Sequence, residues 1–547
     1  MSASNKKKLR NEQASQKLTE RQLAEQKEAK KLKLYTNIFI AIVAVLAVIA
    51  VAVGVSQAVS NSGVRERKTV AMTVGDREVS NSELNYFFLD SLNQFYAQNG
   101  SYAALFGLDM SKPLDQQVMS GEETTTWADY FLDSAKDSAK SVYTLAAAAK
   151  AEGMTLSETD AAAINSNLEM RKLYATMYGY SDAKAYLKAM YGKGATEESY
   201  RGYLESSMLA DAYYQARSEA LTYADSDLRA KEGENPSAYS AYTYNYYYLA
   251  ASKFLEGGTA DAEGTLNYSD EEKNASVLAA EEAAKALISE EITSVDAFDA
   301  AIADLSVNAD AETPAKSAAY DNAAYSGISE TYRQWLTDSA RKEGDKTYIA
   351  NTATGTDESG KEVTTTTGYY VLYFRSVNDN NIPMSSVRHI LVGFEGGTAD
   401  DSGVKVYSAE EKAAAKSEAE EILAQWQTGE ATEDSFAALA NEKSDDGNGT
   451  TGGLYEHIVP SSNYVENFLN WALDSHKAGD TGIVETEYGY HIMYFVGRSQ
   501  QTYRDFMIES ELREADVAQW YTDLLNSVTV TDGNTAFINK SIVMGRQ

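Results

Sequence analysis

The chain has 547 residues, 44% of them hydrophobic and 24% charged, which is the composition of a globular protein of about three or four domains. It has no cysteine, which excludes disulfides, thiolate metal sites, a cysteine nucleophile and a lipidated N-terminal cysteine. Acidic residues outnumber basic ones 81 to 48, and the net charge of −33 argues against nucleic acid as a partner. With only four histidines, a multi-histidine metal enzyme is not expected.

The N-terminus is basic and is followed by an apolar run. Residues 1–34 hold ten Lys or Arg against four Glu, and eighteen uncharged apolar residues follow at Ile38–Val55. At about 1.5 Å per residue this run nearly crosses a hydrocarbon core of about 30 Å, so we expect a transmembrane anchor at 35–60. The positive-inside rule then places the basic tail in the cytoplasm and residues 61–547 outside. A cleaved signal peptide, ending in small residues near Ser56-Gln57-Ala58, stays open as the alternative.

A helical region is expected at 61–240. Residues 69–79 predict two short strands joined by a Gly-Asp turn, and Ser80-Asn81-Ser82-Glu83 has the spacing of a capping box that begins a helix. Beyond these the sequence is rich in alanine, with aromatic residues three and four positions apart, which is typical of amphipathic helices. These aromatic stripes fit either core packing or an apolar cradle for unfolded chains.

The chain then contains an internal repeat. Residues 256–273 match residues 395–412 without a gap, and twelve of the eighteen positions are identical. Shorter matches follow in the same order, such as Gly368-Tyr-Tyr-Val-Leu-Tyr-Phe374 against Gly489-Tyr-His-Ile-Met-Tyr-Phe495. The sequence therefore predicts two copies of one domain, at 241–383 and 384–500. Each copy has β-rich ends and a helical middle, which indicates α+β packing.

The last segment, residues 501–547, begins with another amphipathic helix. Its apolar positions recur at helical spacing from Tyr503 to Leu525 and lie beyond the second copy. An apolar stripe needs a partner, and we expect it to pack on the helical region 61–240.

Five short motifs in the second copy resemble a known family. They are Val387-Arg-His-Ile-Leu-Val392, Gly429-Glu with Phe436-Ala-Ala-Leu-Ala440, Ser444-Asp-Asp446, Gly452-Gly453 and Tyr488-Gly-Tyr-His-Ile492. In this order and spacing they resemble the parvulin peptidyl-prolyl cis–trans isomerases. The resemblance implies a four-stranded antiparallel sheet surrounded by helices, with two histidines back to back at its centre.

The resemblance also implies the site residues. It assigns the catalytic network to His389, Asp446, His491 and Thr486. It assigns the apolar proline pocket to Tyr464, Phe468 and Leu473. This chain departs from the family pattern at Tyr464, where methionine is usual, and at Leu454, where Asp-Leu-Gly is common after the two glycines. The first departure would narrow the pocket, and the second would shift the loop that carries Asp446.

These residue types suit the chemistry. Rotation of an X-Pro amide costs about 18–20 kcal/mol because resonance is lost, and no bond is made or broken. A dry apolar slot and a field that favours the twisted amide are therefore enough, without a nucleophile, cofactor or metal. A structural role of the histidine pair in the sheet stays open. His457 and His476 lie in polar stretches and are expected to be solvated.

The first copy lacks the site. Tyr370 stands in place of His491, the strand around Tyr246 offers no histidine, and no acid stands near Ser306-Val-Asn308 where Asp446 would be. We interpret this copy as an inactive, degenerate parvulin-like domain that serves as scaffold or as a peptide-binding surface.

The whole layout resembles extracytoplasmic foldases of the PrsA and SurA type, an α+β multidomain chain with a helical chaperone module. That resemblance implies an isomerase that assists the folding of exported proteins, with unfolded chains and the lipid bilayer as partners, at the surface of a Gram-positive cell. The alternative is a holdase that binds unfolded exported chains without useful catalysis; a repeat-built adhesive protein fits less well. A homodimer through the helical part also stays open.

Overall fold

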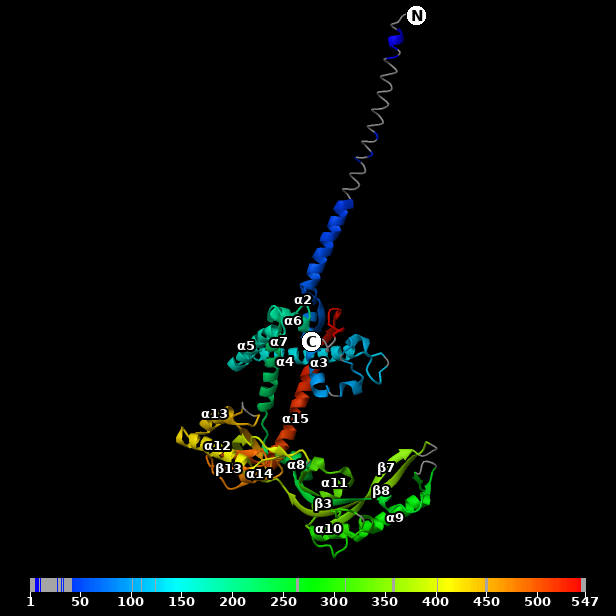
Figure 1. Ribbon diagram of the computed structural model, residues 1–547, viewed down its shortest axis with the longest axis vertical. Helices are drawn as coiled ribbons and strands as arrows, with labels where there is room; N and C mark the ends of the chain where they lie inside the picture. The colour runs from blue at the N-terminus through cyan, green and yellow to red at the C-terminus, as the bar shows by residue number, and fades with distance from the viewer. Residues whose placement is uncertain are drawn as a thin grey trace. The chain divides into compact units, whose positions relative to one another are not determined.

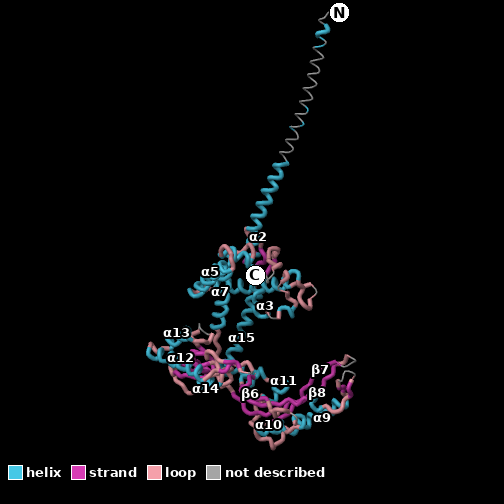
Figure 2. The backbone as a smooth tube through the Cα atoms, viewed as in Figure 1, coloured by secondary structure: helices cyan, strands magenta, loops and turns pink. Residues whose placement is uncertain are grey.

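The structure is a computed structural model (Figures 1 and 2). It describes residues 5–8, 10, 27, 31, 33, 42–100, 102–109, 111–122, 124–261, 265–309, 311–356, 360–400, 402–447 and 451–542. The chain divides into two compact units: unit 1 comprises Met1–Leu221 and Asp516–Gln547, and unit 2 comprises Thr222–Ala515. Most of the basic tail and the first residues of the expected anchor lie outside the described residues.

One helix in the described part of the chain is long and apolar enough to cross a membrane. It runs from Ile42 to Asn61, has a mean hydropathy of 2.6 over an 18-residue window, and buries none of that window in the protein. It continues the apolar run in which the anchor is expected. A signal sequence would have the same length and composition.

Unit 1 is mainly helical, as Figure 2 shows, with one small sheet. The helices are α2 (Val64–Lys68), α3 (Asn81–Asn99), α4 (Trp127–Ala151), α5 (Glu158–Met177), α6 (Ala183–Tyr191), α7 (Glu197–Glu219) and the second half of α15 (Tyr503–Asn526). Two 3-10 turns, η1 (Ala103–Phe106) and η2 (Leu114–Gln116), follow α3. The antiparallel sheet has the order β15-β1-β2, from Val530–Asp532, Val70–Val74 and Arg77–Ser80.

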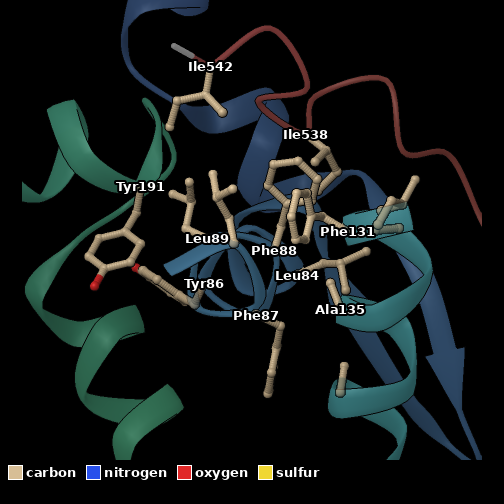
Figure 3. Close-up of a cluster of buried hydrophobic side chains, with 14 of the residues drawn as sticks. Leu84, Tyr86, Phe87, Phe88, Leu89, Phe131, Ala135, Tyr191, Ile538 and Ile542 are labelled. Atoms are coloured by element: carbon tan, nitrogen blue, oxygen red, sulfur yellow. The ribbon is translucent and has the colours of Figure 1, made fainter. Parts of the chain in front are cut away.

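Local sequence fixes where these helices begin. The predicted capping box is present at α3: the Ser80 hydroxyl accepts a hydrogen bond from the Glu83 amide, and the Glu83 carboxylate accepts one from the Ser80 amide. The same arrangement begins α4 at Thr126 and α5 at Ser157. Figure 3 shows the core around α3, where Ile538 and Ile542 of the C-terminal segment pack on its apolar side chains.

The second half of α15 packs within unit 1. Trp520 lies edge-on to Tyr213 of α7, with ring centroids 5.7 Å apart, and Leu524 packs against the same cluster. The Tyr521 hydroxyl lies 2.6 Å from the hydroxyl of Ser141 on α4. Burial of these apolar side chains is what holds the helix against α4 and α7.

Unit 2 begins with α8 (Asp225–Glu234) and η3 (Pro236–Tyr239), and then folds the two copies of the repeat. The first copy contains β3 (Ala241–Ala250), η4 (Ala251–Phe254), β4 (Thr259–Ala260), β5 (Leu266–Asn267), α9 (Asp270–Ala286), α10 (Val295–Ala303), η5 (Ser306–Asn308), β6 (Ala318–Ala324), η6 (Tyr325–Gly327), α11 (Glu330–Leu336), β7 (Lys346–Thr356) and β8 (Glu362–Asn378). The second contains β9 (Pro383–Gly393), β10 (Thr398–Ala399), β11 (Lys405–Val406), α12 (Ala409–Thr428), α13 (Glu433–Lys443), β12 (Leu454–Ile458), α14 (Glu466–Leu473), β13 (Thr481–Glu485) and β14 (Gly489–Thr502).

Each copy has a four-stranded antiparallel sheet with the same strand order. The order is β6-β3-β8-β7 in the first copy and β12-β9-β14-β13 in the second. In the second copy α12 and α13 cover one face of the sheet, around Ile390 and Ile492, and α14 covers the other, around Val387 and Met493. The α+β multidomain class expected from the sequence is therefore confirmed.

The most similar stretch of the repeat has a structural cause. In each copy a two-stranded hairpin (β4–β5 or β10–β11) is tied to the start of the helix that follows it. The Glu411 carboxylate accepts a hydrogen bond from the Gly397 amide at 3.0 Å, and Glu272 accepts one from Gly258 at 2.9 Å. Both glycines have positive φ, where a side chain would be strained. Identity at these positions therefore preserves a hairpin and a helix cap rather than the histidine site.

Candidate active site

The two motif histidines lie on the two central strands of the second sheet. His389 of β9 is opposite Met493, and His491 of β14 is opposite Leu391, so the histidines are diagonal neighbours on one face. Side chains two residues apart on a strand share a face, and Val387 and Met493 place this face under α14. The two Nδ1 atoms are 3.0 Å apart, and both side chains are buried.

Each outer ring nitrogen also has a partner. His389 Nε2 lies 3.0 Å from the Oδ2 atom of Asp446, and His491 Nε2 lies 2.9 Å from the hydroxyl of Thr486. The Thr486 oxygen in turn accepts a hydrogen bond from the Tyr488 amide at 3.2 Å. Four side chains from β9, β14 and two loops thus form one continuous hydrogen-bonded chain.

Burial sets the protonation of this chain. It lowers the pKa of His389 below the ordinary value against the opposing pull of Asp446. Burial, with a smaller effect from the neighbouring His389, lowers the pKa of His491 to about 4. Both rings are therefore neutral near pH 7, and one proton serves each contact. If the Asp446 carboxylate accepts from His389 Nε2–H, then His389 Nδ1 accepts from His491 Nδ1–H, and His491 Nε2 accepts from the Thr486 hydroxyl.

The loop that carries Asp446 is held along β9, beyond the stretch where β12 pairs with it. The amide of Leu391 donates to the Ser444 hydroxyl at 3.0 Å, and the carbonyl of Leu391 accepts from the Asp445 amide at 2.9 Å. The Gly393 amide donates to the Asp445 carboxylate at 2.9 Å. Leu454 stands where the family pattern differs, and the Asp446 carboxylate is still within hydrogen-bond distance of His389.

The two glycines before β12 permit a close backbone approach. The amide of His389 donates to the carbonyl of Gly453 at 2.9 Å, and a Cβ on Gly453 would lie 2.1 Å from the His389 carbonyl oxygen. Gly452 and Gly453 both have positive φ. Any larger residue at Gly453 would push β12 away from the site.

Sequence reasoning missed Tyr455. Its hydroxyl donates to Asp446 Oδ2 at 2.7 Å, the same oxygen that faces His389, and its ring lies 4.9 Å from the His389 ring. A usable signal was present in the alternation along β12. Tyr455 pairs with Val387 and shares its face of the sheet, and Val387 is two residues from His389 on β9, so all three side chains lie on one face. Tyr455 therefore completes the environment of the carboxylate.

An aromatic cluster adjoins the histidines. Phe468 of α14 is buried and lies edge-on to both rings, with centroids 5.3 Å from His389 and 5.5 Å from His491. Tyr464 lies 5.4 Å from Phe468 and 5.6 Å from Tyr455. Leu473, at the end of α14, packs against the same apolar cluster. The structure thus brings together all seven residues singled out from the sequence.

The two remaining histidines lie outside this cluster. The expectation that His476 is solvated is wrong: its ring is half-buried and stacks on Trp471 at 4.1 Å, and its buried Nε2 atom has no hydrogen-bond partner among the described residues. The apolar surface of Trp471 accounts for this, because ring stacking is available even in a polar stretch of sequence. His457 is exposed and stacks on Phe506 at 4.4 Å.

Comparison with known proteins agrees with this geometry. The family described as the PPIC-type PPIase domain (rotamase) matches residues 389–497. A search of the curated proteins finds no match for the chain.

Solved structures give weaker likenesses. PrsA from Bacillus subtilis is 23% identical, with 26% of this chain and 48% of that chain covered and a TM-score of 0.18. PrsA from Bacillus anthracis is 24% identical, with coverages of 27% and 59% and a TM-score of 0.17. A structure from Campylobacter jejuni, described with two SurA-like chaperones, is 24% identical, with coverages of 27% and 56% and a TM-score of 0.15. The chain spans about half the length of these structures.

The family match confirms the activity that the motifs predict. It covers both histidines, Asp446, Thr486 and the aromatic cluster. Residues 389–497 of this chain are a parvulin-type peptidyl-prolyl cis–trans isomerase domain.

Proposed function

We propose that this chain is a membrane-anchored foldase that isomerises X-Pro bonds in exported proteins outside the cytoplasm. The observation that carries the proposal is the hydrogen-bonded histidine pair beside an aromatic cluster, within a domain that matches the parvulin isomerases. The apolar helix Ile42–Asn61 supports the anchor, and the basic tail before it supports a cytoplasmic N-terminus.

The geometry suits a reaction that only rotates a bond. The pocket of Tyr464, Phe468 and Leu473 takes the proline ring and excludes water from the amide. An amide that twists loses its resonance, and its nitrogen and oxygen then change their charge and their demand for hydrogen bonds. A buried, pre-ordered chain of neutral dipoles can favour the twisted state without reorganising during the reaction.

Within the site we assign different roles to the residues. His389 and His491 provide the ordered dipoles next to the pocket. Asp446 and Thr486 act as positioning residues, because each contacts the histidine pair at the outer nitrogen of one ring. No covalent step and no metal are required by this mechanism.

The helical unit 1 would hold unfolded clients near the isomerase. Helix α5 supports this role, since it leaves apolar side chains exposed on one face. Met170, Leu173 and Met177 are 43%, 62% and 61% exposed, at helical spacing, and Tyr178 is 62% exposed. Exposed apolar surface of this kind marks a binding site more often than chance.

The isomerase is tested with the full chain in detergent and a set of X-Pro tetrapeptides. We expect faster cis-to-trans conversion, and a drop of about tenfold or more in kcat/KM for Asp446→Ala and His491→Ala. Tyr370→Ala, at the matching position of the first copy, is the control and leaves the rate unchanged. A chain that is folded but accelerates no peptide would contradict the catalytic role.

A second candidate is a holdase without useful catalysis, which the exposed face of α5 and the tyrosine-rich first copy favour. It predicts that suppression of client aggregation survives Asp446→Ala and His491→Ala, but is lost when Leu173 and Met177 are changed to Asn. An aggregation assay with an unfolded exported protein separates the two roles. If Asp446→Ala and His491→Ala reduce the suppression of client aggregation, the holdase without catalysis is contradicted.

A further inference from the structure

A polar pocket in unit 1 lies at the end of the apolar helix. It has a volume of about 430 Å³, and its walls come from the residues after that helix, from the start of α3, from the turn after α6 and from the segment Ala536–Asn539. That volume falls within the usual range for small-molecule sites. Ser60, one residue before the last residue of the helix, forms part of its rim.

The position of the pocket relative to the helix is fixed by close contacts. Gly63 has positive φ, and a Cβ on it would lie 2.0 Å from the carbonyl oxygen of Lys193. The Arg67 guanidinium donates to the carbonyl of Gly194 at 3.2 Å and to that of Ser62 at 3.1 Å. The end of the apolar helix and the turn after α6 are therefore in direct contact.

This geometry sets the depth of the pocket if the helix spans a bilayer. The uncharged apolar run ends at Val55, and Ser60 follows five residues later, a rise of about 7.5 Å at 1.5 Å per residue. The headgroup layer on each side of the hydrocarbon core is about 5–7 Å thick. Ser60 thus lies at the outer edge of the lipid headgroup layer.

The pocket is basic on a strongly acidic protein. Arg65, Lys188 and Lys193 line it, and within the described residues no ion pair is formed by any of the three. Some other cations of unit 1 do form ion pairs, such as Lys136 with Asp532 at 2.8 Å and Lys172 with Glu169 at 2.6 Å. Three unpaired cations around one cavity, in a chain of net charge −33, indicate an anionic ligand.

The pocket also offers a hydrogen-bond acceptor. The Oε2 atom of Glu66 is buried and has no hydrogen-bond partner within the described residues. An unpartnered buried carboxylate oxygen is costly, and a hydroxyl of a ligand would satisfy it. A phosphate that also carries hydroxyl groups therefore matches the lining better than a bare phosphate.

We propose that this pocket binds the headgroup of an anionic glycerophospholipid. Arg65, Lys188 and Lys193 contact the phosphate, and Glu66 accepts a hydrogen bond from a headgroup hydroxyl. Bound lipid holds unit 1 against the membrane surface, beyond what a single helix provides. This inference rests on the membrane anchor of the proposed function and is independent of the isomerase.

The test uses the full chain in vesicles of phosphatidylcholine and phosphatidylglycerol in equal amounts, with native mass spectrometry of the lipids it retains. We expect bound phosphatidylglycerol to exceed phosphatidylcholine about fivefold. Lys188→Gln with Lys193→Gln brings the ratio close to one. Lys140→Gln with Lys150→Gln removes the same charge from α4 and keeps the preference.

Each other outcome contradicts the proposal in a distinguishable way. If the protein does not float with the vesicles, both the membrane anchor and the lipid site are contradicted. If the protein floats but the ratio of bound phosphatidylglycerol to phosphatidylcholine is one, or is unchanged by Lys188→Gln with Lys193→Gln, only the lipid site is contradicted. Loss of bound phosphatidylglycerol in millimolar sn-glycerol 1-phosphate would reassign the pocket to a soluble glycerol phosphate.

Discussion

The two copies of the repeat share a sheet but differ at its centre. Gly368 and Gly489 begin matching stretches of β8 and β14, and the register of the sheets then aligns Tyr246 with His389 and Tyr370 with His491. The strand order is the same in both copies. Since the first sheet forms with tyrosines at both positions, a histidine pair is not needed to hold this sheet together.

The surroundings of these positions match as well. The same register aligns Tyr320 of β6 with Tyr455 of β12, and spacing from the shared tryptophan aligns Tyr332 with Phe468. Tyr332 lies 6.2 Å from Tyr246 and 5.3 Å from Tyr370, much as Phe468 lies next to the two histidines. The first copy keeps the aromatic packing and replaces the histidine chain with phenol rings.

The acid is also missing in the first copy. Asn308, in the matching loop region, is buried and donates to the carbonyl of Ile302 at 2.8 Å and to the Tyr247 hydroxyl at 3.0 Å. Burial raises the pKa of Tyr246, so that ring stays neutral near pH 7. The comparison teaches that fold and aromatic packing are shared, whereas the hydrogen-bonded chain is specific to the second copy.

The largest expected effect comes from the aromatic ring that packs on the two central positions of each sheet, Phe468 in the second copy and Tyr332 in the first. Phe468→Ala and Tyr332→Ala should each lower the free energy of unfolding of their copy by about 3–5 kcal/mol, because each empties a buried aromatic position. Only Phe468→Ala should also lower kcat/KM, by about tenfold or more. Denaturant unfolding and peptide isomerisation of the full chain check this. The milder Phe468→Leu keeps the fold, and an unchanged rate in that variant would exclude the ring from the pocket.

The next effect is a pH dependence confined to the second copy. Unfolded histidine takes up a proton near pH 6.5, whereas folded His491 stays neutral down to about pH 4. The unfolded state therefore binds more protons in this interval, and the free energy of unfolding falls as the pH falls, by about 3 kcal/mol from His491 alone.

Hydrogen exchange, corrected for its intrinsic pH dependence, measures this copy by copy. Amides of β9 and β14 should lose protection between pH 7 and pH 4 more than those of β3 and β8, because residues 241–383 contain no histidine. Equal losses in both sheets would show that the histidine pair does not cause the effect. His491→Phe, which removes one of the two buried titrating groups, should make the profile shallower.

Much of this comparison was predictable from the sequence. The repeat, the helix caps and the site residues were carried by motifs whose spacing survives in a linear sequence, and alternation along β9 and β14 places both histidines on one face. The helix at 503–525 was predicted from its apolar period and is present as α15.

Other features depend on register and packing. Alternation places Tyr455 on the face of the histidines, but Tyr455 has no motif of its own, so the sequence does not show its hydrogen bond to Asp446. The stacking of His476 on Trp471 and the lining of the pocket at Arg65 and Lys188 come from segments that only tertiary packing brings together. These are long-range contacts, which local patterns do not encode.

Tyr455→Phe tests the contact that the motifs did not show. It removes the hydroxyl that donates to Asp446 at 2.7 Å and keeps the ring, so no cavity forms. A hydrogen bond to a carboxylate contributes about 1.5–3 kcal/mol, and we expect a loss of about 2 kcal/mol in unfolding free energy with a several-fold lower kcat/KM. The matched control is Tyr320→Phe, whose side chain is 42% exposed and should change neither quantity. A variant as active and stable as the parent would remove Tyr455 from the site.

The smallest effect is expected at Thr486, the hydrogen-bond partner of His491 that lies farthest from Asp446 in the series of four side chains. Thr486→Val replaces the hydroxyl that donates to His491 Nε2 with a methyl group of similar size. The nitrogen is then buried without a partner, which costs about 1–3 kcal/mol, partly offset because the hydroxyl also no longer needs burial.

We therefore expect Thr486→Val to lose about 1 kcal/mol of unfolding free energy and to lower kcat/KM a few-fold. A change in the pKa of His491 in this variant would show that the Thr486 hydroxyl acts on the histidine ring. Thr486→Ser keeps the donor and should restore both quantities, and NMR titration of the His491 ring follows the pKa directly. If valine and serine behave alike, packing at this position matters and the hydroxyl does not. If only serine restores the rate, the hydrogen bonds that join Thr486, the two histidines and Asp446 contribute to catalysis. The first copy has lost this hydrogen-bonded series.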